Sequence, residues 1–222
     1  MNSLITLILF LTGRFLYRKT PVVLFVPVFF TVVTCILYLR LLDIKFDQYL
    51  EENRIWTFLL GPAVVALGVL LYKHMQSIKS HLLPMLVTVI LGSLTSVTMV
   101  ALLATILKLP ETLVASLMPL GITTPIAIEV TVPLGGDTSI TSVVVIAIGI
   151  LGNMMSPLWI RWLGIHHMAA AGLGIGMVSH GIGTARAIQL GEVTGLYSGL
   201  AMCLNGVVTV LTAPLIWSLF FG

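Results

Sequence analysis

The residues able to do chemistry gather in two short stretches of otherwise apolar sequence. Residues 121–129 read Gly-Ile-Thr-Thr-Pro-Ile-Ala-Ile-Glu, and residues 181–189 read Gly-Ile-Gly-Thr-Ala-Arg-Ala-Ile-Gln. Placed over one another with an offset of 60, they agree at Gly, Ile, Thr, Ala and Ile. Each combines residues that interrupt helices with polar or ionisable ones, which suggests an internal duplication. Paired interruptions of this kind are the best sequence indication of a transporter's binding site.

The guanidinium of Arg186 could bind a carboxylate through two parallel hydrogen bonds. Ionisable groups within membrane segments are costly, which favours a functional role. The alternative is that the Arg186 side chain reaches the inner interface near Gly191. Glu129 could pair with Arg186, couple protons, or extend toward the outer headgroups.

His180 could titrate during transport or, as a neutral ring, bind backbone carbonyls freed by the break. The hydroxyls of Thr123, Thr124 and Thr184 could bind a ligand while also satisfying freed backbone groups. Free N–H groups and a positive dipole end follow each break, so an anion site is expected at mid-depth. The candidate binding residues are Thr123, Thr124, Pro125, Ser179, His180, Gly183, Thr184, Ala185 and Arg186, with Glu129 and His180 as candidates for proton coupling.

The elements that must position these residues are membrane helices. The chain has 222 residues, of which 58% are hydrophobic and only 9% charged, against roughly 25% charged residues in soluble domains. Long apolar runs favour helices over a β-barrel. The net charge of +3 indicates loop orientation and does not indicate nucleic-acid binding. No metal-ligand spacing, cofactor motif or nucleophile–base pair is present, so neither a cofactor nor an enzyme is expected.

The predicted fold is an all-α integral membrane bundle with two inverted repeats, each containing a broken helix or a re-entrant hairpin. Hairpins are favoured because they leave Arg161 on the inner side, as the positive-inside rule requires. Pro125 is expected to hold the first break open. Residues 1–81 form the N-terminal helices, 82–137 the first repeat with its broken segment at 111–136, and 138–222 the second repeat with its broken segment at 167–191 and a C-terminal span. Full or nearly full spans are expected at 4–16, 21–42, 56–72, 82–107, 139–163 and 196–221, and the arms of the first broken segment at 112–120 and 126–134.

The stretches Thr123–Ala127 and Ser179–Arg186 resemble the LrgB/CidB family, as do residues 61–67 and 149–152. The resemblance implies a multi-pass protein of the bacterial inner membrane that works with a small holin-like partner of the LrgA/CidA type, here expected as a separate chain. It also implies one of two functions. The favoured one is secondary transport of small monocarboxylates such as pyruvate, lactate, glycolate or glycerate, the last two carried by a related plastid protein. The alternative is a holin-like pore or regulator of murein hydrolase export and autolysis. The coupling ion and the oligomeric state, including a homodimer, stay open.

Overall fold

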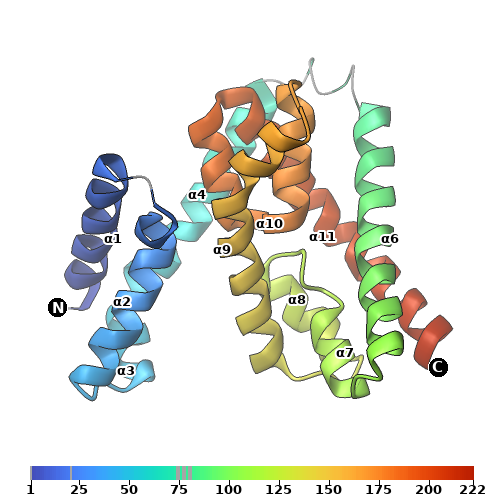
Figure 1. Ribbon diagram of the computed structural model, residues 1–222, viewed down its shortest axis with the longest axis horizontal. Coiled ribbons are helices and arrows are strands. Elements are labelled where there is room, and N and C mark those ends of the chain that lie inside the picture. The colour runs from blue at the N-terminus through green and yellow to red at the C-terminus, as the bar shows by residue number, and fades with distance from the viewer. Residues whose placement is uncertain (1, 21, 74–75, 77–78, 80–81) are drawn as a thin grey trace. The chain divides into compact units, whose positions relative to one another are not determined.

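In a computed structural model, the described residues (2–20, 22–73, 76, 79 and 82–222) form helices joined by short turns and contain no strand, which confirms the all-α prediction. The chain divides into two compact units, Met1–Leu70 and Leu71–Gly222. Figure 1 shows the elements of each unit. Of the described helices, α6, α9 and α11 are long and apolar enough to cross a membrane.

The first unit contains α1 (Asn2–Lys19), a 3₁₀ turn (Val23–Phe25), α2 (Pro27–Leu41), α3 (Phe46–Glu52) and most of α4 (Arg54–Lys73). The helix predicted at 4–16 is present as α1, but it is longer, with 18 residues, and ends with Arg18 and Lys19 in its last turn. Cations there are favourable at the negative end of the helix dipole. The span expected from residue 21 begins only at Pro27, which occupies the first turn of α2, where a missing N–H costs least. Pro21 lies outside the described residues.

A polar cluster holds the start of α1 against α2 and α3. The Tyr38 hydroxyl donates to Asn2 Oδ1 at 2.7 Å, and the Thr6 and Tyr49 hydroxyls lie 2.7 Å apart. Between the spans predicted at 21–42 and 56–72 the chain thus contains a short helix, α3, whose Tyr49 is bound to α1.

The second unit begins with α6 (Leu82–Leu107), whose bounds match the predicted span. It continues through α7 (Glu111–Leu117), α8 (Thr124–Thr131), α9 (Thr138–Trp162), α10 (Met168–Leu190) and α11 (Glu192–Phe221). Both α7 and α8 pack on α9, and α10 packs on α9 and α11. Figure 1 shows α7 and α8 beside one half of α9 and α10 beside the other half.

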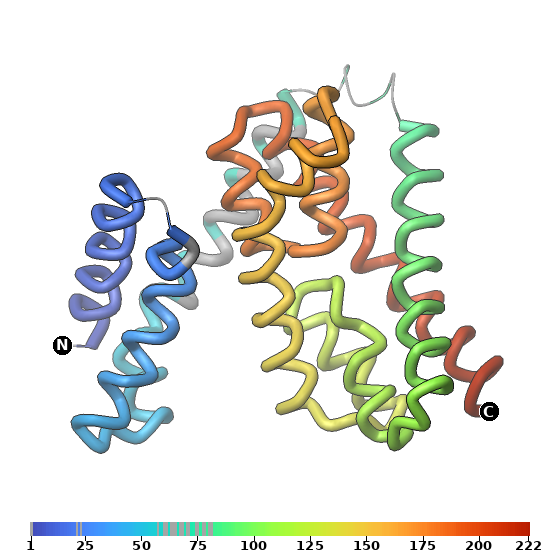
Figure 2. The backbone as a smooth tube through the Cα atoms, in the orientation of Figure 1, coloured from blue at the N-terminus to red at the C-terminus, as the bar shows by residue number. Residues whose placement is uncertain are grey.

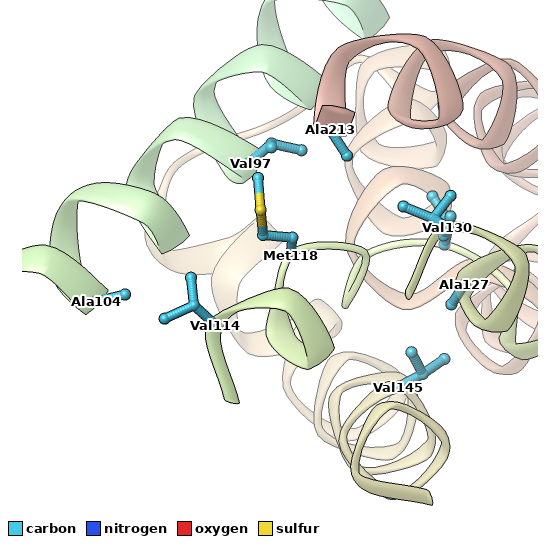
Figure 3. Packing of buried hydrophobic residues seen from close by; sticks show 9 residues of the cluster. Val97, Ala104, Val114, Met118, Ala127, Val130, Val145 and Ala213 are labelled. Atoms are coloured by element: carbon cyan, nitrogen blue, oxygen red, sulfur yellow. The ribbon is translucent and has the colours of Figure 1, made fainter. Parts of the chain in front are cut away.

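The hydrophobic core of the second unit lies around the first broken segment. Val97 of α6, Val114 of α7, Met118 of the break, Ala127 of α8 and Val145 of α9 are all nearly inaccessible to solvent. Figure 3 shows their side chains converging from these elements, with Met118 directed toward Val97. Burial of this cluster fixes the short helices α7 and α8, which would be unstable alone in water.

Close backbone packing fixes α10 on α11. A Cβ on Gly172 would overlap the Thr194 carbonyl oxygen, and one on Gly176 would overlap the carbonyl oxygen of Ser198. Small residues permit this approach between membrane helices. On the other side of His180, a Cβ on Gly195 would lie 2.9 Å from Cα of Ile188. Residues 172 and 188 therefore meet the same turn of α11, and the chain reverses between them, as the trace in Figure 2 shows.

Candidate functional site

The centre of the second unit is the place where its two broken segments meet. The side-chain nitrogen of Asn205, on α11, donates to the carbonyl oxygen of Gly121 at 3.0 Å and to that of Met177 at 3.1 Å. Gly121 lies in the first break and Met177 one turn before the second. Asn205 is only 4% exposed. One buried amide thus joins both interruptions.

The first interruption extends from Met118 to Thr123, between α7 and α8. Its arms, 111–117 and 124–131, are shorter than predicted. Thr123 has extended backbone angles, and α8 begins at Thr124 with Pro125 in its first turn. Thr124 is thus helical, although Pro125 was expected to disfavour helix there; that Pro125 holds the break open stays a prediction. Proline has no N–H to lose at this position and its fixed φ suits a helix start, so Pro125 begins the helix that follows.

The second interruption is a single residue. His180 has φ 40° and ψ −133°, while the flanking parts of α10 are helical. The break therefore lies within the segment predicted to be broken, 167–191, one residue before the stretch 181–189. The Nε2 atom of His180 lies 3.0 Å from the Val145 carbonyl oxygen. Because a carbonyl only accepts, this nitrogen carries the proton and donates. The strained backbone persists because the ring is buried against α9.

The hydroxyls beside the second break bind protein groups. Ser179 donates to the Ile175 carbonyl at 2.8 Å. Thr184 donates to the His180 carbonyl at 2.8 Å and lies 2.9 Å from the hydroxyl of Ser198. Asn153 of α9 donates to the Ile182 carbonyl at 2.8 Å. These side chains donate to backbone carbonyls, as in the alternative in which the threonine hydroxyls satisfy backbone groups freed by the break.

The two ionisable candidates do not meet. Arg186 donates from Nη1 to Gln189 Oε1 at 3.0 Å, within its own helix, and Glu129 is exposed. Both residues lie in the described part of the chain, and no ion pair joins Glu129 to Arg186. Of the remaining candidates, Gly183 packs against the Ser179 side chain and Ala185 is exposed. Thr123 and Thr124 are half-buried and Pro125 is exposed.

Asn205 is the residue that sequence reasoning missed. Its signal was available, because a polar amide in the middle of an apolar span seldom lacks a partner. Asn205 lies outside both helix-breaking stretches, which supplied most of the other candidates. The carbonyls of Gly121 and Met177 belong to segments far from it in sequence.

An apolar groove of about 400 Å³ lies between α9 and the first part of α10, with Gly152, Ser156, Trp159, Gly174 and Ser179 among its lining residues. The Ser156 hydroxyl is buried and has no hydrogen-bond partner. Among the described residues no cluster of three His, Cys, Asp or Glu side chains could hold a metal ion. The polar groups at the place where the two broken segments meet are therefore amide, hydroxyl, imidazole and backbone groups.

Comparison with known proteins agrees with the resemblance seen in the sequence. The LrgB-like family matches residues 6–219. The Bacillus subtilis proteins YwbG and YxaC are each 32% identical to this chain, over 98% of its length and 97% and 94% of theirs. The antiholin-like protein LrgB of Bacillus mycoides is 30% identical over 95% of this chain and 92% of its own. No solved structure shows significant similarity. Because the family match covers residues 6–219, which lie in both units, the chain belongs to the LrgB-like family.

Proposed function

We propose that this chain is an antiholin-like protein of a bacterial inner membrane that restrains murein hydrolase activity and autolysis, together with an LrgA/CidA-like partner. The observation that carries the proposal is the 30% identity, over 95% of the chain, to proteins named antiholin-like protein LrgB. This replaces monocarboxylate transport, which the sequence analysis favoured, as the leading function.

The interior of the second unit is compatible with a regulator that forms no pore of its own. A conducting pore needs polar or charged groups lining an open path. Around the junction, the amide nitrogen of Asn205, the ring of His180 and the hydroxyl of Thr184 are instead bound to protein groups. A protein that acts by binding a pore-forming partner requires no such lining.

The test uses a bacterium whose own LrgB-family gene is deleted. Restoring this chain should lower extracellular murein hydrolase activity and slow lysis after a detergent challenge, and the effect should require the LrgA-like partner. A matched strain carries Asn205→Leu at equal membrane abundance and should behave like the deletion. Equal lysis with and without the wild-type chain would refute the regulatory role.

Transport of a small monocarboxylate is the second candidate, and the meeting of the two breaks at Asn205 favours it. Interrupted segments that meet near mid-depth are a common plan for transporter binding sites. Helices resume after both breaks, at Thr124 and beyond His180. Their N-terminal ends attract anions. Saturable uptake of labelled pyruvate, lactate, glycolate or glycerate into liposomes containing this chain would support transport, and uptake equal to that of empty liposomes would exclude it.

The membrane arrangement that accompanies both functions is a pair of re-entrant hairpins in inverted repeats. Its support is the chain reversal at each break. Ser116 of α7 accepts from the backbone N–H of Asp137 at 2.7 Å, and Thr131 of α8 lies 2.9 Å from Thr141 of α9. Both arms of the first segment thus approach the start of α9, while both arms of the second approach the start of α11.

A further inference from the structure

The apolar groove between α9 and the first part of α10 is long and narrow. It has a volume of about 400 Å³, and its wall on α9 extends from Ile148 to Leu163. At ~1.5 Å per residue this wall is about 22 Å long, which exceeds the ~15 Å depth of one half of the hydrocarbon core. A helix about 10 Å across would need about 1,700 Å³ over this length, so the groove is too narrow to enclose one.

A single acyl chain of a lipid fits these dimensions. A methylene group is about as large as a water molecule, ~30 Å³ in the liquid, so about 13 of them fill the groove. Met155, Ile160 and Val178 provide apolar walls, against which an acyl chain packs favourably. Gly174 keeps the groove open, because a Cβ added there meets nothing within 4 Å.

One end of the groove is basic. Leu163 and Ile165 line this end, and their near neighbours in the chain, Arg161, His166 and His167, are exposed. All three basic residues lie in the described part of the chain, and no ion pair joins any of them to a carboxylate. The sequence contains no Asp or Glu from residue 138 to residue 191. Both walls of the groove therefore belong to helices whose charge is complementary to an anion.

Groups that can bind a lipid headgroup lie at the same end. The first part of α10 begins at Met168, and His167, its N-cap residue, makes no side-chain capping bond. The free N–H groups and the positive end of the helix dipole attract anions there. His167 shares a face of α10 with Ala171 and Gly174, which line the groove. Trp159 also lines the groove, and an indole at headgroup level can donate to a phosphate or ester oxygen.

We propose that the groove between α9 and α10 binds an anionic phospholipid, with one acyl chain along the groove and the phosphate at the start of α10. Arg161, His166, His167 and the first N–H groups of α10 hold the phosphate, as basic pockets between membrane helices do for anionic lipids. A zwitterionic lipid binds more weakly, because it brings a positive group to the same basic end. Such a lipid site is independent of either candidate function.

The experiment measures thermal unfolding of the purified full-length protein in detergent, with phosphatidylglycerol or phosphatidylcholine of identical acyl chains added in steps. A ligand of the folded state raises the midpoint as its occupancy rises. Phosphatidylglycerol should half-saturate this rise at a concentration about tenfold lower than phosphatidylcholine, the usual worth of one charge-assisted hydrogen bond. Equal half-saturation for the two lipids, or no rise with either, would overturn the proposal.

Two variants test the two parts of the site. Gly174→Leu places a side chain in the groove, where a Cβ meets no other atom, and should lose the response to both lipids. Replacing Arg161, His166 and His167 together by glutamine should keep the response to phosphatidylcholine and lose the preference for phosphatidylglycerol. The control is Ala147→Leu, which adds a leucine at an exposed position of α9 outside the groove and should respond like the wild type.

The mass of each protein–detergent complex, measured on the same samples, shows whether a variant is folded and whether it is a dimer. A response kept by Gly174→Leu, or a phosphatidylglycerol preference kept by the glutamine variant, would overturn the site. Loss of a dimer in Gly174→Leu with an unchanged lipid response would assign the groove to a second copy of the chain. If Gly174→Leu does not fold, the glutamine variant decides alone, because its three positions are exposed.

Discussion

The side-chain nitrogen of Asn205 lies 3.0 Å from the carbonyl oxygen of Gly121, although 84 residues separate them. The same nitrogen also binds the carbonyl of Met177. A single side chain on the last helix therefore satisfies backbone groups in two segments whose helices are interrupted. This relationship makes Asn205 the residue on which the arrangement of the second unit depends most directly.

Replacing Asn205 by leucine should destabilise the second unit strongly. The change leaves two part-buried carbonyls without their donor, at up to about 1–3 kcal/mol each. We expect a loss of about 2–5 kcal/mol, measured by unfolding in nanodiscs. Cys203→Ala is the matched control, because Cys203 is exposed on the same helix and should change stability by less than about 0.5 kcal/mol. Similar losses for both variants would contradict the bridging role.

Two glycines on α10 provide a second pair of contrasting variants. A Cβ on Gly176 would overlap the Ser198 carbonyl, whereas one on Gly174 would meet nothing within 4 Å. Gly176→Ala should therefore push α10 away from α11 and cost about 1–3 kcal/mol. Gly174→Ala should be neutral or stabilise the helix by up to about 1 kcal/mol. Thermal unfolding of both variants decides this, and equal midpoints would show that the close contact is not required.

Cysteine labelling tests the re-entrant hairpins. Glu111 and Ser139 flank the first broken segment, His167 and Glu192 flank the second, and all four are exposed. Single cysteines at 111 and 139 should react with an impermeant maleimide from the outer side, and those at 167 and 192 from the inner side. The background is a variant with Cys35 and Cys203 replaced. Labelling of 111 and 139 from opposite sides would establish a crossing segment instead.

Arg186 distinguishes the two candidate functions. Its guanidinium binds Gln189 on the same helix, so under the regulatory proposal we expect Arg186→Lys to protect cells from lysis as well as the wild type does. If Arg186 instead binds the carboxylate of a transported substrate, Arg186→Lys should abolish that binding, because lysine lacks the planar fork of donors. Both lysis and monocarboxylate uptake are measured for Arg186→Lys and Arg186→Ala. Loss of saturable uptake in the lysine variant would assign Arg186 to a binding site and contradict our expectation.

The sequence by itself determined the all-helical class, the family and several helix bounds. The helix α6 has the bounds 82–107 that its apolar run predicted. The prediction succeeds because both the hydropathy of the run and the formation of a membrane helix depend on the apolar character of neighbouring residues. The sequence did not locate the breaks to the residue. Pro125 begins a helix and Gly181 lies within one, since both residues are tolerated in more than one backbone context.

Only the tertiary structure decided what the polar residues do. Arg186 and Glu129 were prominent because charges are rare in apolar sequence, yet in the folded chain they do not meet. Asn205 was inconspicuous, and its importance arises from two carbonyls that the fold brings to it. Helix formation follows from nearest neighbours and solvent, whereas the partner of a buried polar group depends on which distant segments pack around it. That information lies in the packing of α10 and α11 and in no single stretch of the chain.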